Sequence, residues 1–466
     1  MSVTTAPGLA GLQARMESEF GPRLMTQLPR LGWDAGQLAA HQTERLRALL
    51  ARAAKRSPFH ARRLGHIDPA RFELADLGRL PVMTKAELMA SFDEVVTDRR
   101  VTLTRVEDHL RAAGHQAALL LGDYVCLASG GSSGQRGVFV QTIGEYADYA
   151  AAILRYPVAG MLAAGRSADG TVIAMAAAAA PVHSTRFLAA ALGGGVQMVP
   201  VPVTLPLAQA VEQLNALQPT VLVGYPSRLA QLAAEQRAGR LCIAPQSVGA
   251  TSEMLTDASR AAITAAFGLP VLNSFASTEG LTGASEPGGT VISFATDLCL
   301  AELVDSSGRP APAGTPSARV LITNLHNLTQ PLIRYELTDS FTAPPGSQPG
   351  GYLRATVEGR DDGMLRYRDV SIHPHVIRTV LASAAAVTDY QVRQTQTGID
   401  VAAAASKDLD QAALAAALAT SLCQAGLSHP QVTVRAVTTI TRHPDTGKAR
   451  CFIPIGNDDG PDGEQG

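Results

Sequence analysis

The chain has 466 residues, of which 46% are hydrophobic and 17% are charged. This length exceeds a single hydrophobic core, so we expect at least two domains. The 39 lysine and arginine residues against 41 aspartate and glutamate residues give a formal net charge of −2, which excludes a nucleic-acid binder with a basic face. The five cysteines include no Cys-x-x-Cys pair, so neither a zinc ribbon, a redox dithiol nor a disulfide framework is indicated.

The N-terminal sequence shows no targeting signal. It begins Met1-Ser2-Val3-Thr4-Thr5, without the basic segment and apolar run of a secretory signal. The longest apolar run, residues 172–182, is about half as long as a membrane span needs. We therefore expect a soluble, cytoplasmic protein with no membrane partner.

Helices come first along the chain, and a mixed pattern follows. Residues 1–120 predict helices with charged faces, among them 37–55 and 85–91, the second after a Thr84 cap. From residue 121 onward, short Val/Ile/Leu runs alternate with Ala/Leu-rich helical stretches, which predicts a largely parallel sheet covered by helices. The strands are expected at 171–176, 197–201, 220–223, 247–250 and 271–275, and the helices between them at 206–217, 227–237 and 256–267.

The pattern changes again in the last third of the chain. After Gly283 the segments are β-rich and broken by Gly and Pro, and a polar Gly/Asp stretch near residue 360 marks a domain boundary. The predicted domains are 1–360 and 361–456, with a disordered acidic tail at 457–466. The second domain fits a small βαβ-type module, with strands at 364–372, 387–395, 399–404 and 431–440 and helices at 374–383 and 408–425. The fold class is therefore α/β, with a large N-terminal domain of mixed and parallel sheets and a small C-terminal α+β domain.

Five short segments together predict a nucleotide site. Residues 128–137 can surround phosphates with backbone N–H groups, residues 275–279 offer a hydroxyl and a carboxylate for phosphate and Mg²⁺, and residues 334–339 end in a carboxylate suited to ribose hydroxyls. Residues 359–362 and the triplet Thr446-Gly447-Lys448 follow in order. Each segment alone is weak evidence for a nucleotide site, and their occurrence together in one chain strengthens that prediction.

The glycine-rich segment is not a P-loop, because it lacks both Gly-Lys-Ser/Thr and the Gly-x-Gly-x-x-Gly spacing. A strand is expected before it at 124–128 and a helix after it at 143–164, which would place the glycines at a strand–helix turn where N–H groups converge. A plain surface loop is the alternative.

The motifs resemble the adenylate-forming (ANL) superfamily, and within it the phenylacetate–CoA ligase-like branch. The resemblance runs from Ser57-Pro58-Phe59 and residues 80–85 to Gly447-Lys448, which is almost the whole chain. It implies ATP and Mg²⁺ as cofactors and a C-terminal domain that is mobile about a hinge at Asp362. The implied ATP-binding positions are Ser129, Gly130, Gly131, Ser132, Ser133, Gly134, Arg136, Gly249, Ala250, Thr251, Asn273, Ser274, Phe275, Asp339 and Arg360.

The resemblance also implies catalytic and pocket positions. Lys448, Glu279, Thr278 and Arg360 correspond to the catalytic residues, and Glu279 to the Mg²⁺ ligand. The acid pocket corresponds to His183, Tyr225 and Ala276, although His183 is equally typical of a core or capping histidine. Aromatic residues at strand ends, such as Phe275, are also commonly part of a core.

Two positions depart from the family pattern. Gln135-Arg136 stands where the family has Lys-Pro, so any charge assistance there would come from a guanidinium. Asp369 stands where the family has a glycine that lets the thiol arm of CoA pass close to the backbone. An aspartate would narrow that acceptor channel and repel a thiolate, so the sequence supports adenylation better than thioester formation.

The expected function is ATP-dependent activation of a small, aromatic carboxylic acid as acyl-AMP, followed by transfer to an acceptor. The expected acceptor is CoA or an amine. The sequence does not decide whether the protein forms a homodimer. One alternative within this chemistry is activation of nitrite for diazotisation of an aryl amine. The other alternative is a protein of a different class, a catalytically silent relative that only binds nucleotide. The presence of Lys448 and Glu279 argues against this alternative.

Overall fold

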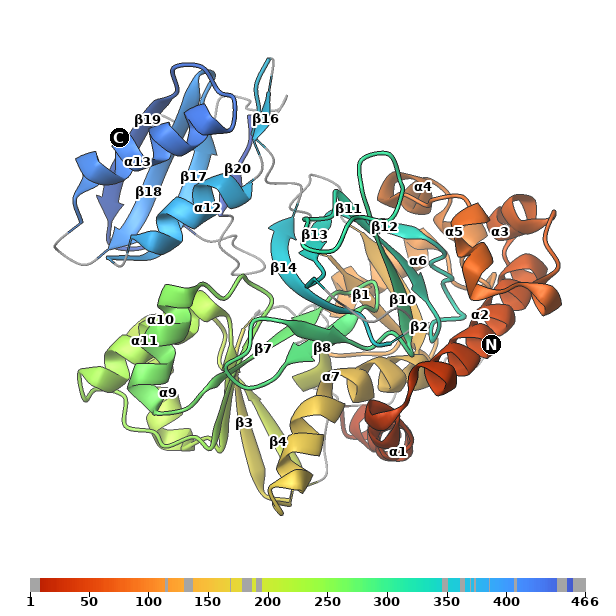
Figure 1. Ribbon diagram of the computed structural model, residues 1–466. Helices are drawn as coiled ribbons and strands as arrows, with labels where there is room; N and C mark the ends of the chain where they lie inside the picture. The colour runs from red at the N-terminus through yellow and green to blue at the C-terminus, as the bar shows by residue number, and fades with distance from the viewer. Residues whose placement is uncertain are drawn as a thin grey trace.

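The computed structural model describes residues 9–113, 116–129, 137–167, 169–177, 187–189, 195–345, 351–360, 365–368, 370–372, 374–384, 386–405, 409–441 and 451–455. A mixed sheet lies at the centre of the larger part of the molecule (Figure 1). Its strand order is β13-β14-β9-β8-β7-β6-β5-β3-β4, and β4, β3, β5, β6 and β7 run parallel. Their bounds are β3 Thr171–Ala176, β4 Val196–Pro200, β5 Val221–Gly224, β6 Ser247–Thr251, β7 Val271–Ala276, β8 Thr282–Ser285, β9 Ile292–Phe294, β13 Asp339–Thr342 and β14 Arg354–Arg360.

Helices cover both faces of the parallel strands (Figure 1). On one face lie α9 (Leu207–Leu217), α10 (Pro226–Arg237) and α11 (Asp257–Phe267), and on the other lie α7 (Ile143–Ala163) and α1 (Leu9–Gln27). Strand residues alternate between the two cores: Ala174 and Ala176 pack with α9 to α11, whereas Met175 packs with α1 and α7. The predicted parallel sheet and its helices are confirmed, with bounds within one or two residues.

The N-terminal region is helical, as expected. Its further helices are α2 (Ala35–Arg56), α3 (Pro58–Leu64), α4 (Lys85–Ala90), α5 (Phe92–Val95) and α6 (Leu103–Ala113). The Thr84 cap is confirmed, because its hydroxyl accepts from the Glu87 N–H and the Glu87 carboxylate accepts from the Thr84 N–H. A three-stranded sheet of β10 (Cys299–Val304), β11 (Arg319–Asn324) and β12 (Tyr335–Leu337) joins this region to the centre, since Met83 pairs with Tyr335.

The two strands that flank the glycine-rich segment form a hairpin, and the helix comes only after the second of them. Strand β1 (Tyr124–Ala128) pairs antiparallel with β2 (Val138–Thr142), and α7 begins only after β2. The expectation of a direct strand-to-helix turn was therefore wrong. The short run from Val138 to Gln141 is buried against β1, which a sequence pattern adjacent to a long helix does not reveal.

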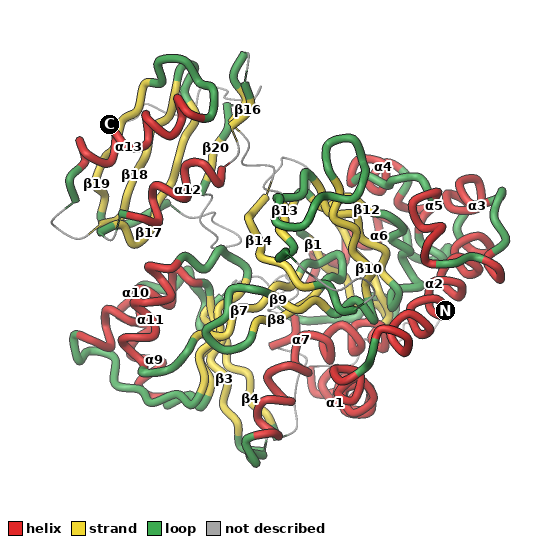
Figure 2. The backbone as a smooth tube through the Cα atoms, viewed as in Figure 1, coloured by secondary structure: helices red, strands yellow, loops and turns green. Residues whose placement is uncertain are grey.

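The C-terminal part has its own sheet and core. The four-stranded sheet has the order β19-β18-β17-β20, and α12 and α13 lie together on one of its faces (Figure 2). Strands β18 and β19 are parallel and joined through α13, which confirms the βαβ-type unit. The bounds are β15 Leu365–Arg366, β16 Ser371–Ile372, α12 Pro374–Ser383, β17 Val387–Gln394, β18 Gly398–Ala405, α13 Gln411–Gln424, β19 Gln431–Val437 and β20 Phe452–Ile453.

Two details of this part differ from the sequence pattern. The single strand expected at 364–372 is a hairpin of two short strands, β15 and β16, and β20 was not expected. The domain boundaries stay a prediction, since residues 361–364 and 457–466 lie outside the described residues. Among the helices described, none is both long enough and apolar enough to span a bilayer.

Candidate nucleotide site

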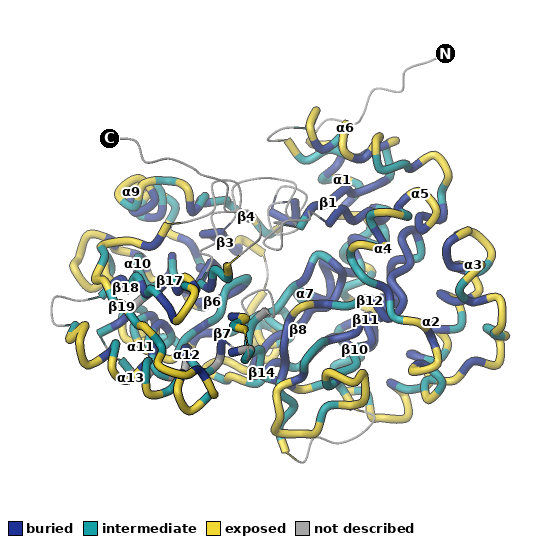
Figure 3. Tube along the Cα trace, turned by 90° about the horizontal axis from the view of Figure 1, so that it is seen from above, coloured by how far each residue is buried: buried dark blue, intermediate teal, exposed yellow. Residues whose placement is uncertain are grey.

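Two of the segments with implied ATP-binding residues meet at one edge of the parallel sheet. Because β5, β6 and β7 are adjacent and parallel, their carboxyl ends lie side by side, at the edge where open α/β sheets bind ligands. Gly249, Ala250 and Thr251 end β6, while Asn273, Ser274, Phe275 and Ala276 end β7. The two ends are joined by the Ser274 hydroxyl, which donates to the Ala250 carbonyl at 3.1 Å. The structure therefore brings these implied ATP-binding residues together. Figure 3 shows the buried and half-buried course of β6, β7 and β8 through the molecule.

The residues predicted to bind phosphate and Mg²⁺, Thr278 and Glu279, lie in a tight turn between β7 and β8. The Ser277 N–H donates to the Leu281 carbonyl at 2.9 Å, and the Leu281 N–H donates to the Ser277 hydroxyl at 3.2 Å. Gly280 has φ +115°, a conformation that residues with a Cβ rarely adopt, and a Cβ there would overlap the Asn324 side-chain amide. The sequence Ser-Thr-Glu-Gly thus fits this turn for backbone reasons as well as chemical ones.

The Glu279 side chain is mostly buried, with 7% of the residue exposed. Burial and the nearby Glu279 carboxylate raise the pKa of the Cys299 thiol well above its ordinary value, so Cys299 stays a neutral thiol. Thr278 and Glu279 offer a hydroxyl and a carboxylate oxygen, which are the hard donors that Mg²⁺ prefers. This donor set fits the ion, and its role as a ligand stays a prediction.

Phe275 belongs to a cluster of three aromatic rings. Its ring meets Phe294 at 5.6 Å and Phe341 at 5.3 Å, both edge-on, while Phe294 and Phe341 stack at 4.9 Å. Phe275 is only half-buried, so this core does not cover the residue completely. The cluster also fixes β7 against β13, since Phe341 lies two residues beyond Asp339 on the same strand.

Asp339 and Arg360 lie opposite each other across antiparallel strands. Asp339 is the first residue of β13 and pairs in register with Arg360, the last residue of β14. Asp339 is 6% exposed, and the ladder shifts register just beyond the pair, at Ser340 and Phe341. The predicted ribose-binding residue, Asp339, and the predicted catalytic residue Arg360 are therefore neighbours on adjacent strands.

The hairpin loop predicted to hold phosphates is closed at its base by two residues. Ser129 donates its N–H to the Gly137 carbonyl at 2.9 Å, and the Gly137 N–H donates to the Ser129 hydroxyl at 2.9 Å. A Cβ on Gly137 would lie 2.9 Å from both the Ser129 hydroxyl and the Phe139 ring, so a larger residue there would displace one of these side chains. The base of the loop is thus well defined by side-chain and backbone contacts.

Several predicted site residues lie outside the described residues. They are Gly130, Gly131, Ser132, Ser133, Gly134, Arg136, His183, Asp362, Asp369 and Lys448. Tyr225 is described, follows β5 directly and is 1% exposed, packed in the core shared with α7. Its predicted place in the acid pocket stays untested, although the side chain as it stands is part of that core.

The sequence did not predict the residues whose side chains hydrogen-bond to the backbone of the Thr278–Glu279 turn. Tyr149 donates its hydroxyl to the Ser277 carbonyl at 3.0 Å, and Asn324 donates its side-chain amide to the Glu279 carbonyl at 2.8 Å. Arg334, the first residue of segment 334–339, has a structural role. Its guanidinium donates to both Glu302 carboxylate oxygens, at 2.9 and 3.0 Å, and to the Leu80 carbonyl at 2.6 Å. No feature of the sequence singles out Tyr149 or Asn324.

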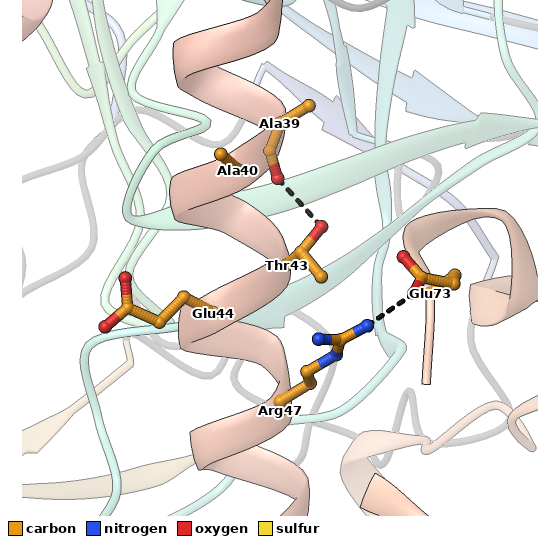
Figure 4. A pocket seen from close by; sticks show the side chains of 6 residues that line it. All are labelled: Ala39, Ala40, Thr43, Glu44, Arg47 and Glu73. Carbon is orange, nitrogen blue, oxygen red and sulfur yellow. Dashed lines mark hydrogen bonds and ion pairs between the residues drawn. The ribbon is translucent and has the colours of Figure 1, made fainter. Parts of the chain in front are cut away.

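An open depression of about 530 Å³ lies elsewhere, on α2 (Figure 4). It is lined by Ala39, Ala40, Thr43, Glu44, Arg47 and Glu73, and an ion pair joins Arg47 to Glu73. None of these residues belongs to the nucleotide motifs. We therefore assign no part of the candidate site to this depression.

No known family model matches the chain. Protein CapK of Staphylococcus aureus is 27% identical over 176 residues, which is 36% of this chain and 37% of CapK, so the chain matches little more than a third of that relative's length. A 2-hydroxyisobutyryl-CoA ligase in the postadenylation state, in complex with 2-HIB-AMP, is 18% identical, with a TM-score of 0.67 and 89% of each chain covered. The chain has the fold of the adenylate-forming ligases.

Two further comparisons support this fold assignment. ATP-bound MatB from Rhodopseudomonas palustris is 15% identical, with a TM-score of 0.51 over 69% of this chain and 65% of MatB. The same 2-hydroxyisobutyryl-CoA ligase in its thioesterification state, in complex with 2-HIB-AMP and CoA, gives a TM-score of 0.55 over 90% of each chain. These comparisons confirm the α/β fold class and the resemblance in fold to the adenylate-forming ligases.

Proposed function

We propose that this protein is an ATP-dependent, AMP-forming ligase that activates a small carboxylic acid. One observation carries the proposal: direct contacts join the end of β6 to β7 and β7 to β13, where Asp339 pairs in register with Arg360, and the Thr278–Glu279 turn follows β7 at the same edge of an adenylate-forming ligase fold. Each predicted segment would be unremarkable alone. Their convergence supports a single nucleotide site with the acid beside it.

The chemistry follows from charge. A carboxylate oxygen of the acid attacks the α-phosphorus of ATP, a new P–O bond forms, and the bond to the β-phosphate oxygen breaks to release pyrophosphate. Both reactants are negative, so cationic and hydrogen-bonding groups must stabilise the added charge of the pentavalent transition state. A bound Mg²⁺ would supply part of that charge.

The residues of this chain take separate roles in the proposal. Glu279 and Thr278 would hold the ion and the phosphates, Asp339 would accept hydrogen bonds from the ribose hydroxyls, and the ammonium of Lys448 would reach the reacting phosphate from the C-terminal domain. We also propose the domain division at residues 360 and 361, with Asp362 as the hinge. That hinge would move Lys448 away after the first half-reaction.

The acceptor is the less defined half of the proposal. The 2-hydroxyisobutyryl-CoA ligase of similar fold is known in complex with CoA, which favours a thiol acceptor. Asp369, where the family has glycine, favours a non-thiol acceptor such as an amine, and keeps nitrite with an aryl amine as a second candidate reaction. The same attack on the α-phosphorus would activate nitrite in place of the acid.

Pyrophosphate release tests the proposal. The purified protein with Mg²⁺ and ATP is mixed with a panel of aryl and aliphatic acids, and separately with nitrite plus an aryl amine, each with and without CoA. We expect release that depends on one acid, with the acyl-AMP seen by mass spectrometry. Asp369→Gly should add thioester formation without changing the first step. If no arm releases pyrophosphate, the protein is a nucleotide-binding relative without this activity.

A further inference from the structure

A buried loop links the Thr278–Glu279 turn to the strand that leaves the glycine-rich segment. Three side-chain amides of this loop make the connection: Asn324, Asn327 and Gln330, which are 1%, 5% and 0% exposed. We call these three residues the amide bridge. Buried amides are costly unless they are hydrogen-bonded, so the partners of each one are informative.

At one end, the Asn324 amide is fixed in a single orientation. Its oxygen accepts from the His326 N–H at 3.1 Å and from the Asn327 N–H at 3.0 Å. Only its NH₂ group can then face the Glu279 carbonyl, to which it donates at 2.8 Å. The backbone of Glu279 is thereby tied to the loop that begins at the end of β11.

At the other end, the bridge binds the free edge of β2. Asn327 donates to the Val140 carbonyl at 3.0 Å, Gln330 accepts from the Val140 N–H at 2.9 Å, and Gln330 donates to the Val138 carbonyl at 3.1 Å. Among the described residues, β2 pairs with β1 alone, so its other edge needs partners for these backbone groups. The two side chains supply them as a neighbouring strand would.

The bridge is continuous from end to end. The Gln330 N–H donates to the Asn327 side-chain oxygen at 2.8 Å, and the Asn327 N–H donates to the Asn324 side-chain oxygen. Val138 directly follows Gly137, which closes the base of the glycine-rich segment with Ser129. The contacts therefore run from the base of the glycine-rich segment, through the three side-chain amides, to the backbone carbonyl of Glu279, the predicted metal ligand.

We propose that Asn324, Asn327 and Gln330 are positioning residues that hold the Thr278–Glu279 turn at a fixed distance from the base of the glycine-rich segment. The inference rests on the proposed function, in which both segments handle the phosphates of one nucleotide. A displacement of about 1 Å in such a site costs about 10²-fold in rate. Backbone support of this kind acts through the turn and never touches substrate.

The test uses Asn324→Asp, which keeps the shape and the oxygen that accepts two N–H groups and loses the donor to Glu279. Its control is Gln42→Glu, because Gln42 is 9% exposed and also donates once to a backbone carbonyl, that of Thr296, at 2.8 Å. Both variants exchange a buried amide for a carboxyl group, and only one lies in the bridge. The readout is ATP–pyrophosphate exchange with phenylacetate, benzoate or whichever panel acid the wild type uses fastest, at several Mg²⁺ concentrations, beside the thermal midpoint.

We expect Asn324→Asp to lower the maximal exchange rate about 10²-fold and to raise the Mg²⁺ concentration needed for half-maximal rate. Gln42→Glu should exchange about as fast as the wild type, although its thermal midpoint should also fall because it loses a buried hydrogen-bond donor. Asn327→Asp should act in the same direction, and the double variant should be little worse than either single one, because the two amides act as one unit. Hydrogen–deuterium exchange should rise at residues 277–281 in Asn324→Asp and not in Gln42→Glu.

Two results would overturn the inference while the proposed function stands: full exchange activity in Asn324→Asp, or equal losses in both variants that follow their thermal midpoints. A wild type that exchanges with no acid would instead refute the proposed function, and the wild-type arm alone would show it.

Discussion

The buried ion pair between Arg155 and Asp297 makes a sharp prediction about stability. Both side chains are 0% exposed, and the two Arg155 nitrogens donate to the two carboxylate oxygens at 2.8 and 2.7 Å. Arg155 lies on α7 and Asp297 between β9 and β10, so the pair joins two distant segments. The Arg155 side chain lowers the pKa of Asp297 against the opposing effect of burial, so the carboxyl group is ionised at neutral pH.

Replacing Arg155 by methionine would leave that carboxylate with the Arg30 guanidinium, at 3.4 Å, as its nearest cation. Removing one member of a buried pair costs up to about 3–5 kcal/mol of unfolding free energy, and here Arg30 compensates the remaining carboxylate only in part. The double variant Arg155→Met/Asp297→Leu should lose less than either single variant, since neither fully buried charge of the pair is left. As a control, Arg240→Met removes an ion pair whose arginine is 65% exposed and should cost at most about 1 kcal/mol.

Urea unfolding followed by far-UV circular dichroism measures these differences. A loss of under about 1 kcal/mol in Arg155→Met, or losses that simply add in the double variant, would refute the reasoning.

Three further predictions concern the turn, two histidines and the metal. Gly280→Ala should cost about 1–3 kcal/mol more than Gly268→Ala, because a Cβ at Gly280 overlaps Asn324 whereas Gly268, at φ +69°, has open space; equal thermal unfolding midpoints would contradict this. Burial lowers the pKa of His60 and of His326 from 6.5 to about 4, so the unfolded chain binds more protons in that window. The unfolding free energy should therefore fall as pH drops from 6.5 toward 4, by up to about 1.4 kcal/mol per unit for each histidine, and urea midpoints that do not change between pH 7 and 5 would count against it. Glu279→Gln should raise the Mg²⁺ concentration for half-maximal pyrophosphate release more than it weakens metal-free nucleotide binding, and an unchanged Mg²⁺ titration would give Glu279 a structural role.

The parallel strands and their helices could be predicted because each is marked locally. A Val/Ile-rich run such as Val221–Gly224 ends in glycine, and the next helix begins at Pro226, so pattern and turn chemistry agree. Strand β2 could not be predicted, because its five residues lie directly before a helix and are strand only through pairing with β1. Long-range pairing of this kind has no local signal.

Some residues of the candidate site could likewise be predicted from the sequence, and others could not. Thr278, Glu279 and Asp339 could be predicted because the motifs that contain them occur in order along the chain. Asn324, Asn327 and Gln330 could not, because a run of polar residues is typical of an exposed loop. They are buried because their amides replace missing backbone partners of β2 and of the Thr278–Glu279 turn, and that need exists only in the folded molecule.

Lys448→Ala gives the most direct test of adenylation by this chain. Acyl-AMP formation and nucleotide binding are measured side by side in the wild type and the variant, with the acid that supports the fastest pyrophosphate release. If the Lys448 ammonium acts mainly on the charge of the transition state, adenylate formation should fall by about 10²–10³-fold while ATP binding stays nearly unchanged. A variant that forms acyl-AMP within a few-fold of the wild-type rate would contradict the account.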